Sequence, residues 1–98
     1  METFNDIINS DKPVLVDFYA EVCTVSKAME PTIQEVARST AGIARVIKIN
    51  IVKNDRTAQD YNISSVPTLI LFRKGKILWR HPGMIDKATL LYLLVQYS

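Results

Sequence analysis

The sequence is poor in the residues that mark several special classes of protein. Its 98 residues include one cysteine and one histidine, too few ligands for a structural zinc site and too few thiols for an internal disulfide. No apolar run approaches the roughly 20 residues that span a bilayer, and the first residues lack the pattern of a signal peptide. We therefore expect no metal, no membrane association and a reducing, cytoplasmic location.

An excess of charge of one sign is also lacking. Twelve Lys and Arg residues against ten Asp and Glu give a formal net charge of +2. This charge is too small to favour nucleic acid or an anionic membrane as a partner. Hydrophobic residues make up 48% of the chain and charged residues 22%, which is typical of a soluble globular protein. The length suits one domain, residues 1–98.

The spacing of apolar residues predicts alternating helices and strands. Strands are expected where β-branched and aromatic residues cluster, at residues 14–20, 45–51, 68–72 and 76–80. Helices are expected where apolar residues recur at helical spacing or follow a capping residue, at 3–8, 26–39, 54–62 and after Asp86. A strand, helix and strand followed by a hairpin indicate an α/β layered domain with a mixed sheet.

The lone cysteine lies where the first strand gives way to a helix. The free backbone amides and the dipole of a helix start favour a thiolate. Such positions lower the pKa of a thiol from about 8.5 to between roughly 3.5 and 7.5. Cys23 would then attack a disulfide sulfur and form a mixed disulfide. The alternative is a small buried hydrophobic residue, and spacing alone does not decide between them.

Three segments together resemble the thioredoxin family. They are PVLVDFYAEVC, SKAMEP and VPTLILFRKGK, within a resemblance that runs from about Phe4 to Leu94. The specific signal is their combination of Asp17 in the first strand, Cys23 at its end, Pro31 eight residues later, Lys48 in the next strand, and Val66-Pro67-Thr68 before the third. The resemblance implies a thioredoxin-like fold, with a central mixed sheet of four or five strands and helices on both faces.

Two departures from the family pattern bear on function. The family carries Trp-Cys-Gly-Pro-Cys, whereas this chain has Val22-Cys23-Thr24-Val25-Ser26. The opening strand of the family is not recognised before Phe4, so residues 45–51 are expected at a sheet edge that is open to pairing.

Ser26 limits the chemistry that the resemblance implies. In a dithiol enzyme the second cysteine attacks the mixed disulfide, and a serine hydroxyl does not replace it. An external thiol, such as glutathione or a protein thiol, would then release the substrate. Ser26 would either donate a hydrogen bond to the thiolate or serve only as an ordinary residue of the helix start.

Asp17 and Lys48 are expected to act on each other. A carboxylate within VLVDFYA is at least partly desolvated, which raises its pKa unless a cation pairs with it. Lys48, one strand over, is the candidate cation, although a solvated edge charge is its alternative. In the family the aspartate helps to deprotonate the second cysteine. Here it is either a structural remnant or a group that moves a proton for an incoming thiol.

The expected substrate contacts flank the cysteine and the proline turn. They are Val22, Thr24, Val25, Val66, Pro67 and Thr68. The resemblance implies a cis bond before Pro67, whereas sequence alone favours a trans proline. The turn would leave the Val66 backbone free to bind an extended substrate strand. Val22 and Val25 replace a tryptophan and a proline of the family, which puts substrate range and redox potential in question.

Three functions remain open at this point. The first is a thiol:disulfide oxidoreductase that uses Cys23 alone, with protein disulfides or thiols as partners. It needs no cofactor and would be reduced by glutathione as co-substrate or by a thioredoxin reductase. The second is a redox-inactive binding module, and the third is a dithiol thioredoxin whose second cysteine was replaced by Ser26, naturally or by engineering. A monomer or a weak homodimer is expected.

Overall fold

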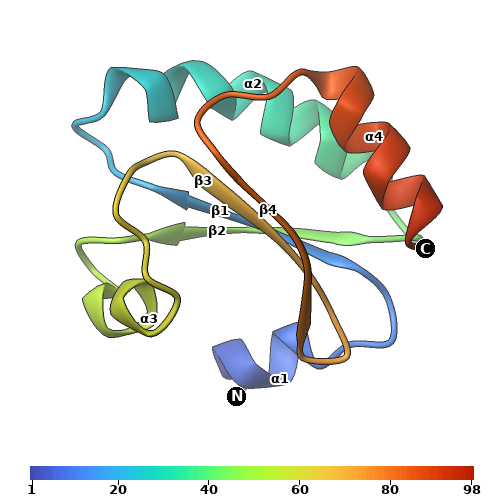
Figure 1. Cartoon of the computed structure of the whole chain (residues 1–98). Coiled ribbons are helices and arrows are strands. Elements are labelled where there is room, and N and C mark those ends of the chain that lie inside the picture. Colours follow the sequence, from blue (N-terminus) through green and yellow to red (C-terminus); the bar gives the residue numbers. More distant parts are fainter.

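The computed structural model describes residues 1–98 and contains four strands and four helices (Figure 1). Their order is α1 (Phe4–Ile8), β1 (Val14–Tyr19), α2 (Thr24–Ser39), β2 (Arg45–Asn50), α3 (Asp55–Asp60), β3 (Thr68–Arg73), β4 (Lys76–Pro82) and α4 (Lys87–Gln96). Every predicted element is present. The main difference is that α2 begins at Thr24, two residues before its predicted start, so that Cys23 itself becomes the residue that precedes the helix.

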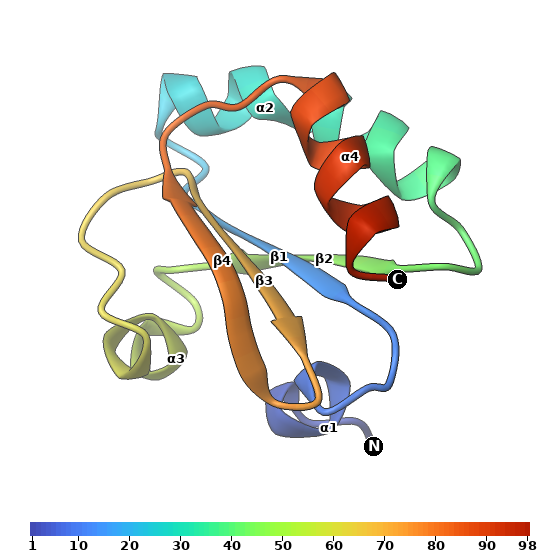
Figure 2. The ribbon, with the colours of Figure 1, turned by 45° about the vertical axis from the view of Figure 1, so that its right-hand side comes forward.

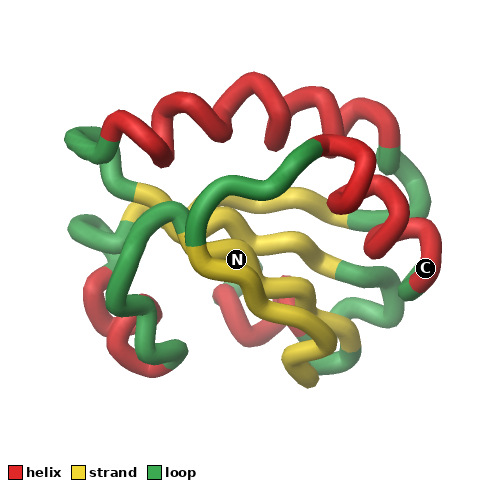
Figure 3. Tube along the Cα trace, turned by 45° about the horizontal axis from the view of Figure 1, so that its top comes forward, coloured by secondary structure: helices red, strands yellow, loops and turns green.

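The four strands form one mixed sheet in the order β2-β1-β3-β4 (Figure 3). β1 runs parallel to β2 and antiparallel to β3, and β4 forms a hairpin with β3. The sheet has four strands rather than five, with β2 at one edge as predicted. The end of β1 therefore lies inside the sheet, between the β2 and β3 sides, and this is where α2 begins.

The two faces of the sheet are covered by different helices (Figure 2). α2 and α4 lie over one face, which we call the upper face, and α1 and α3 lie under the other, the lower face. β1 alternates between them, because successive side chains of a strand point to opposite sides. Val14, Val16 and Phe18 join the lower core, whereas Leu15 joins the upper one.

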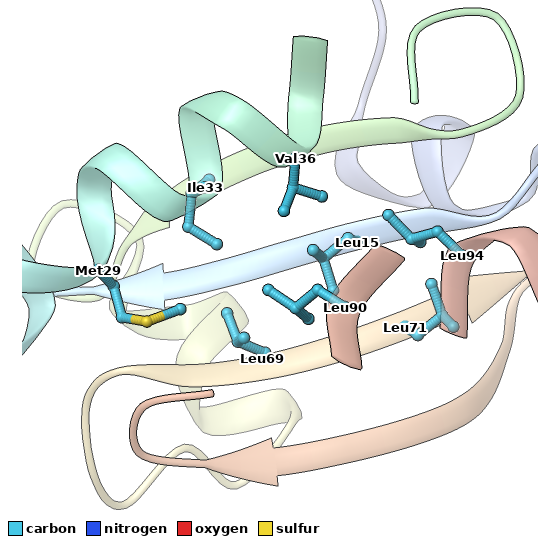
Figure 4. Close-up of a cluster of buried hydrophobic side chains, with 8 residues drawn as sticks. All are labelled: Leu15, Met29, Ile33, Val36, Leu69, Leu71, Leu90 and Leu94. Carbon is cyan, nitrogen blue, oxygen red and sulfur yellow. The ribbon is translucent and has the colours of Figure 1, made fainter. Parts of the chain in front are cut away.

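The upper core consists of eight buried aliphatic side chains (Figure 4). They are Leu15, Met29, Ile33, Val36, Leu69, Leu71, Leu90 and Leu94. The α2 members recur at spacings of four and three residues, which places them on one side of the helix. Val95 of α4 points away from this core and is 59% exposed. This core fixes α2 against the sheet and so fixes the position of its first turn.

The predicted helix caps are present, with one difference. Thr3 forms a capping box with Asp6 at the start of α1, and Asp86 accepts a hydrogen bond from the Thr89 backbone at 3.1 Å. Asn54 precedes α3 as predicted, but its side chain makes no capping bond and instead donates to the Asn50 carbonyl at 3.1 Å. None of the helices combines the length and apolar character needed to cross a membrane.

Candidate functional site

Cys23 lies at the N-terminus of α2, directly after the turn that follows β1. Its backbone is extended, and its N–H donates to the Ala20 carbonyl at 3.2 Å, which closes the turn. The first free amides of α2 therefore surround the sulfur, since the opening N–H groups of a helix have no partner within it. The side chain is partly exposed. The structure thus places the thiol at a helix start and not in the core.

The surroundings lower the pKa of the Cys23 thiol. The largest contribution comes from the Ser26 backbone N–H, followed by the Ser26 hydroxyl, and the Val25 N–H adds to them. Each of these donors stabilises the thiolate more than the thiol, while partial desolvation opposes them. The sulfur is consequently set up to act as a nucleophile nearer to neutral pH than an ordinary cysteine.

A loop distant in sequence meets the thiol. The Cys23 sulfur donates a hydrogen bond to the Val66 carbonyl at 3.5 Å, and the Val66–Pro67 peptide bond is cis. The Pro67 carbonyl accepts from the Gly83 N–H at 2.7 Å, which ties this loop to the end of β4. The Val66 N–H has no acceptor within the chain. The loop therefore offers an unpaired backbone donor beside the sulfur.

Ser26 lies beneath the cysteine. It is 3% exposed, and its hydroxyl accepts from the Ala20 N–H at 3.5 Å. The hydroxyl is thus directed toward the turn that carries Cys23, which agrees with its effect on the pKa of the thiol. Ser26 also borders a cavity of about 140 Å³ between the end of β1 and the first turns of α2.

Asp17 is buried on the upper face without any partner. It is 1% exposed, and neither of its carboxylate oxygens makes a hydrogen bond. Desolvation is the main cause that raises its pKa to about 6, with Lys48 acting against the rise and Glu30 adding to it. An unpaired carboxyl in such a place is a candidate for proton transfer.

Lys48 does not form the ion pair with Asp17 that the sequence suggested. Its ammonium binds the Glu30 carboxylate at 2.7 Å and lies 4.4 Å from the centre of the Tyr19 ring. Lys48 and Asp17 are nevertheless neighbours across β1 and β2. The lysine side chain therefore runs along the sheet toward α2. Sequence reasoning missed Glu30, although its position four residues after Ser26 places it on the same side of the helix.

The expected substrate contacts divide into exposed and buried residues. Val22 is 93% exposed, and Thr24 and Val25 are exposed as well, whereas Pro67 is buried. Thr68 is a correction, because it is buried and its hydroxyl donates to the Ser65 carbonyl at 2.7 Å. It holds the loop and does not line the surface.

Sequence reasoning missed other apolar residues at this surface. Val52 lines a shallow hollow together with Val22, and Met84, next to Gly83, is exposed. No pattern within one segment links Val22 and Val52, since the fold brings them together from two loops. No group of three potential metal ligands comes together anywhere in the chain.

A mixed sheet of this topology, with a thiol at the end of its first strand beside a proline turn, defines the thioredoxin-like class. Comparisons with known proteins agree with this. Residues 1–96 match the family model described as Thioredoxin. The chain is 44% identical over 85 residues to a thioredoxin of Acidithiobacillus ferridurans, an alignment that covers 87% of this chain and 79% of that protein.

Two further comparisons extend the match. A thioredoxin of Synechocystis is 36% identical over 92 residues, which are 94% of this chain and 86% of that one. A mutant thioredoxin from Halobacterium salinarum has a similar structure, with a TM-score of 0.85, 32% identity, and coverage of 95% of this chain and 80% of that one. The chain therefore belongs to the thioredoxin family of thiol–disulfide oxidoreductases.

Proposed function

We propose that the protein carries out thiol–disulfide exchange through Cys23 alone. One observation carries this proposal: the Cys23 sulfur lies at the first amides of α2, within 3.5 Å of the Val66 carbonyl, and no second cysteine exists in the chain. A thiol in this position has a lowered pKa. It therefore reacts as a thiolate, but it has no partner within the chain with which to form a disulfide.

The proposed exchange has two steps that balance without a cofactor. In the first, the Cys23 thiolate attacks one sulfur of a partner disulfide, forms a mixed disulfide and releases the other sulfur as a thiolate. In the second, an external thiolate attacks the mixed disulfide, forms a new disulfide with the partner sulfur and regenerates the Cys23 thiolate. These two steps release one partner sulfur as a thiolate and leave the other in a disulfide with the external thiol. A second external thiolate must attack that disulfide to free the second partner sulfur, and the two external thiols are then oxidised to a disulfide of their own. A reducing compartment such as the cytoplasm supplies this thiol.

Two side chains on the upper face assist these steps in the proposal. The Ser26 hydroxyl donates to the Cys23 thiolate and stabilises it as a leaving group in the second step. Asp17 takes up the proton that the external thiol loses. Its pKa of about 6 leaves it mainly as a carboxylate at pH 7, so it is able to accept that proton.

The partner in this proposal is an extended protein segment that carries a disulfide. The unpaired Val66 N–H is a donor for its backbone, in the manner of strand addition. The exposed side chains of Val22, Thr24 and Val25 would contact its side chains. Glutathione, another protein thiol or a thioredoxin reductase would supply the reducing equivalents, and the thioredoxins among the relatives make protein disulfides the first substrates to test.

Alkylation of Cys23 as a function of pH tests the central claim. We expect the midpoint of the rate profile to lie below the value of about 8.5 for a free cysteine. A midpoint at or above that value would contradict a nucleophilic role and favour a protein that only binds. The unfolded chain in denaturant is the matched control, because it contains the same thiol without the helix.

Turnover is tested with a protein–glutathione mixed disulfide as substrate and glutathione as the external thiol. We expect reduction by the unaltered protein and none by Cys23→Ser. Ser26→Cys should add reduction of insulin disulfides with a dithiol donor, because it restores a thiol that releases the substrate. Failure of the unaltered protein together with success of Ser26→Cys would show that exchange here requires two cysteines.

A further inference from the structure

The Glu30–Lys48 ion pair lies at the mouth of the cavity beneath the cysteine. The cavity, about 140 Å³ in volume, is bordered by Tyr19, Ser26, Glu30 and Lys48 among others. The two charged side chains are about one third and one half exposed, and their atoms are 2.7 Å apart. The pair is therefore partly open to solvent and lines the same cavity as Ser26.

The backbone positions would also allow Lys48 to form an ion pair with Asp17. Asp17 and Lys48 are paired residues of β1 and β2, so their side chains leave the sheet on the same face. A lysine facing a buried carboxylate normally pairs with it, because an unpaired buried charge is costly. The observed arrangement is the opposite, since Lys48 binds Glu30 while both oxygens of Asp17 lack a partner.

No other group near Asp17 takes the place of that cation. On the same face, β3 presents Leu69 and Leu71 and α4 presents Leu90 and Leu94, all of them apolar. Lys27 of α2 and Glu21 border the cavity, but neither is among the charges that shift the pKa of Asp17. Only Lys48 and Glu30 influence Asp17 through their charge.

We propose that Glu30 is a positioning residue that holds the Lys48 ammonium at the cavity mouth and so leaves the buried carboxyl of Asp17 without a cation. Glu30 is a long side chain in the second turn of α2, and it draws Lys48 toward the helix and across the Tyr19 ring. In its absence Asp17 is the remaining carboxylate whose charge acts on Lys48. Glu30 therefore controls the pH range in which Asp17 binds a proton.

The effect of Glu30 on Asp17 does not depend on the proposed function, but its effect on disulfide exchange does. If Asp17 takes the proton of the external thiol, Glu30 determines the pH at which the second step of exchange begins to fail. With Lys48 released, Asp17 would remain ionised at lower pH. The acidic limit of the release step would then move to lower pH as well.

The test is a titration of the Asp17 carboxyl carbon by NMR in the full chain. In Glu30→Gln the midpoint of Asp17 should fall by roughly one pH unit, because the Glu30 charge is lost and the freed lysine approaches Asp17. In Lys48→Gln the remaining Glu30 charge should raise it. The fall caused by Glu30→Gln should be smaller in the Lys48→Gln background, which has no lysine to free. The double variant Glu30→Gln with Lys48→Gln should return the midpoint close to that of the unaltered protein, because both charges are then removed.

Glu35→Gln is the matched control. Glu35 lies on the same helix and pairs with Lys87 at 3.1 Å, so its loss removes an equal charge and an equal ion pair away from Asp17. In the Glu35→Gln variant the midpoint of the Asp17 titration should stay unchanged. An unchanged midpoint in Glu30→Gln, or shifts in the same direction in both single variants, would overturn the inference.

The rate of release from a preformed Cys23–glutathione mixed disulfide is measured in parallel. Its acidic limit should follow the Asp17 midpoint in each variant. Absence of release from every variant would count against the proposed function alone, because the NMR titration does not depend on exchange. The two claims therefore fail separately.

Discussion

The two faces of the sheet differ in what they bury. The upper face combines an aliphatic core with a buried carboxyl, a buried hydroxyl and an ion pair, contributed by Asp17, Ser26, Lys48 and Glu30. The lower core has no buried carboxyl or amine, and its one ionisable side chain is the half-buried phenol of Tyr61. The difference arises within single strands, since Asp17 and Phe18 are consecutive residues that alternation sends to opposite sides. All the side chains that the proposed function uses besides Cys23 and its surface contacts therefore belong to the upper face.

The lower face is held by four aromatic rings. Phe4, Phe18, Tyr61 and Phe72 contact one another, with the Tyr61 and Phe72 rings 5.3 Å apart in an edge-on arrangement. Edge-on pairs of this kind add to the stability that burial supplies. They link α1 to the end of α3 beneath β1 and β3. The face thus anchors the strand that ends at the functional site.

The largest expected effect is on stability, in Phe72→Ala. Removal of this fully buried ring should lower the free energy of unfolding by about 3 to 5 kcal/mol, measured by denaturant unfolding. The pH profile of Cys23 alkylation should not change, because the ring lies on the face away from the thiol. A shifted pH profile would contradict the view that the lower core does not affect the thiol.

Leu69→Ala is the matched variant on the upper face. Leu69 is also fully buried and is the residue that pairs with Asp17 in β3. Its removal should destabilise the protein by a similar amount, but the space it leaves beside the carboxyl should admit water and lower the midpoint of the Asp17 titration.

A smaller effect of opposite sign is expected for Asp17→Asn. The rise of the Asp17 pKa from 3.8 to about 6 means that the folded state favours the protonated carboxyl. Its contribution to stability is complete below pH 3.8 and is lost as the pH rises through about 6. This difference corresponds to about 3 kcal/mol.

The asparagine should therefore stabilise the protein at pH 7 by about 2 to 3 kcal/mol and flatten the dependence of stability on pH between 4 and 7. Denaturant unfolding at several pH values measures this. Equal stability of the two proteins at pH 7 would show that a bound water or cation compensates the carboxylate.

The smallest expected effect is that of Ser26→Ala. Loss of the hydroxyl should raise the midpoint of Cys23 alkylation slightly, because one of the hydrogen bonds that stabilise the thiolate is removed. The midpoint should remain below that of the unfolded chain, because the Ser26 backbone N–H contributes more than the hydroxyl and is retained. Thr24→Ala, which removes a hydroxyl without hydrogen bonds at the same helix start, should leave the midpoint unchanged.

The sequence was sufficient for the elements and for the position of the thiol. Clusters of β-branched and aromatic residues predicted the strands, and apolar residues at helical spacing, such as Met29, Ile33 and Val36, predicted α2. These predictions succeed because a strand and a helix present their side chains at fixed periods. The first turn of α2 was less certain, since Thr24 and Val25 carry no strong signal for a helix start.

Long-range pairing between side chains was beyond the sequence. Lys48 has two possible partners, Asp17 and Glu30, and its pairing with Glu30 depends on how α2 packs on the sheet. Thr68 shows the same limit, because its motif suggested a surface contact whereas a bond to Ser65 turns it inward. Val95 is exposed because α4 turns Leu90 and Leu94 into the core, with Leu91 packed beside them.

The position of β2 gives Lys48 another task. The N–H groups of Arg45 and Ile51 donate to backbone carbonyls next to or within β1. The even-numbered residues between them therefore direct their backbone N–H and C=O groups away from β1, where a strand of another chain could form further hydrogen bonds. A charged side chain in the middle of such a border is a common protection against unwanted association. Besides its pairing with Glu30, Lys48 would therefore hinder strand-to-strand association of two copies of the protein along the exposed edge of β2.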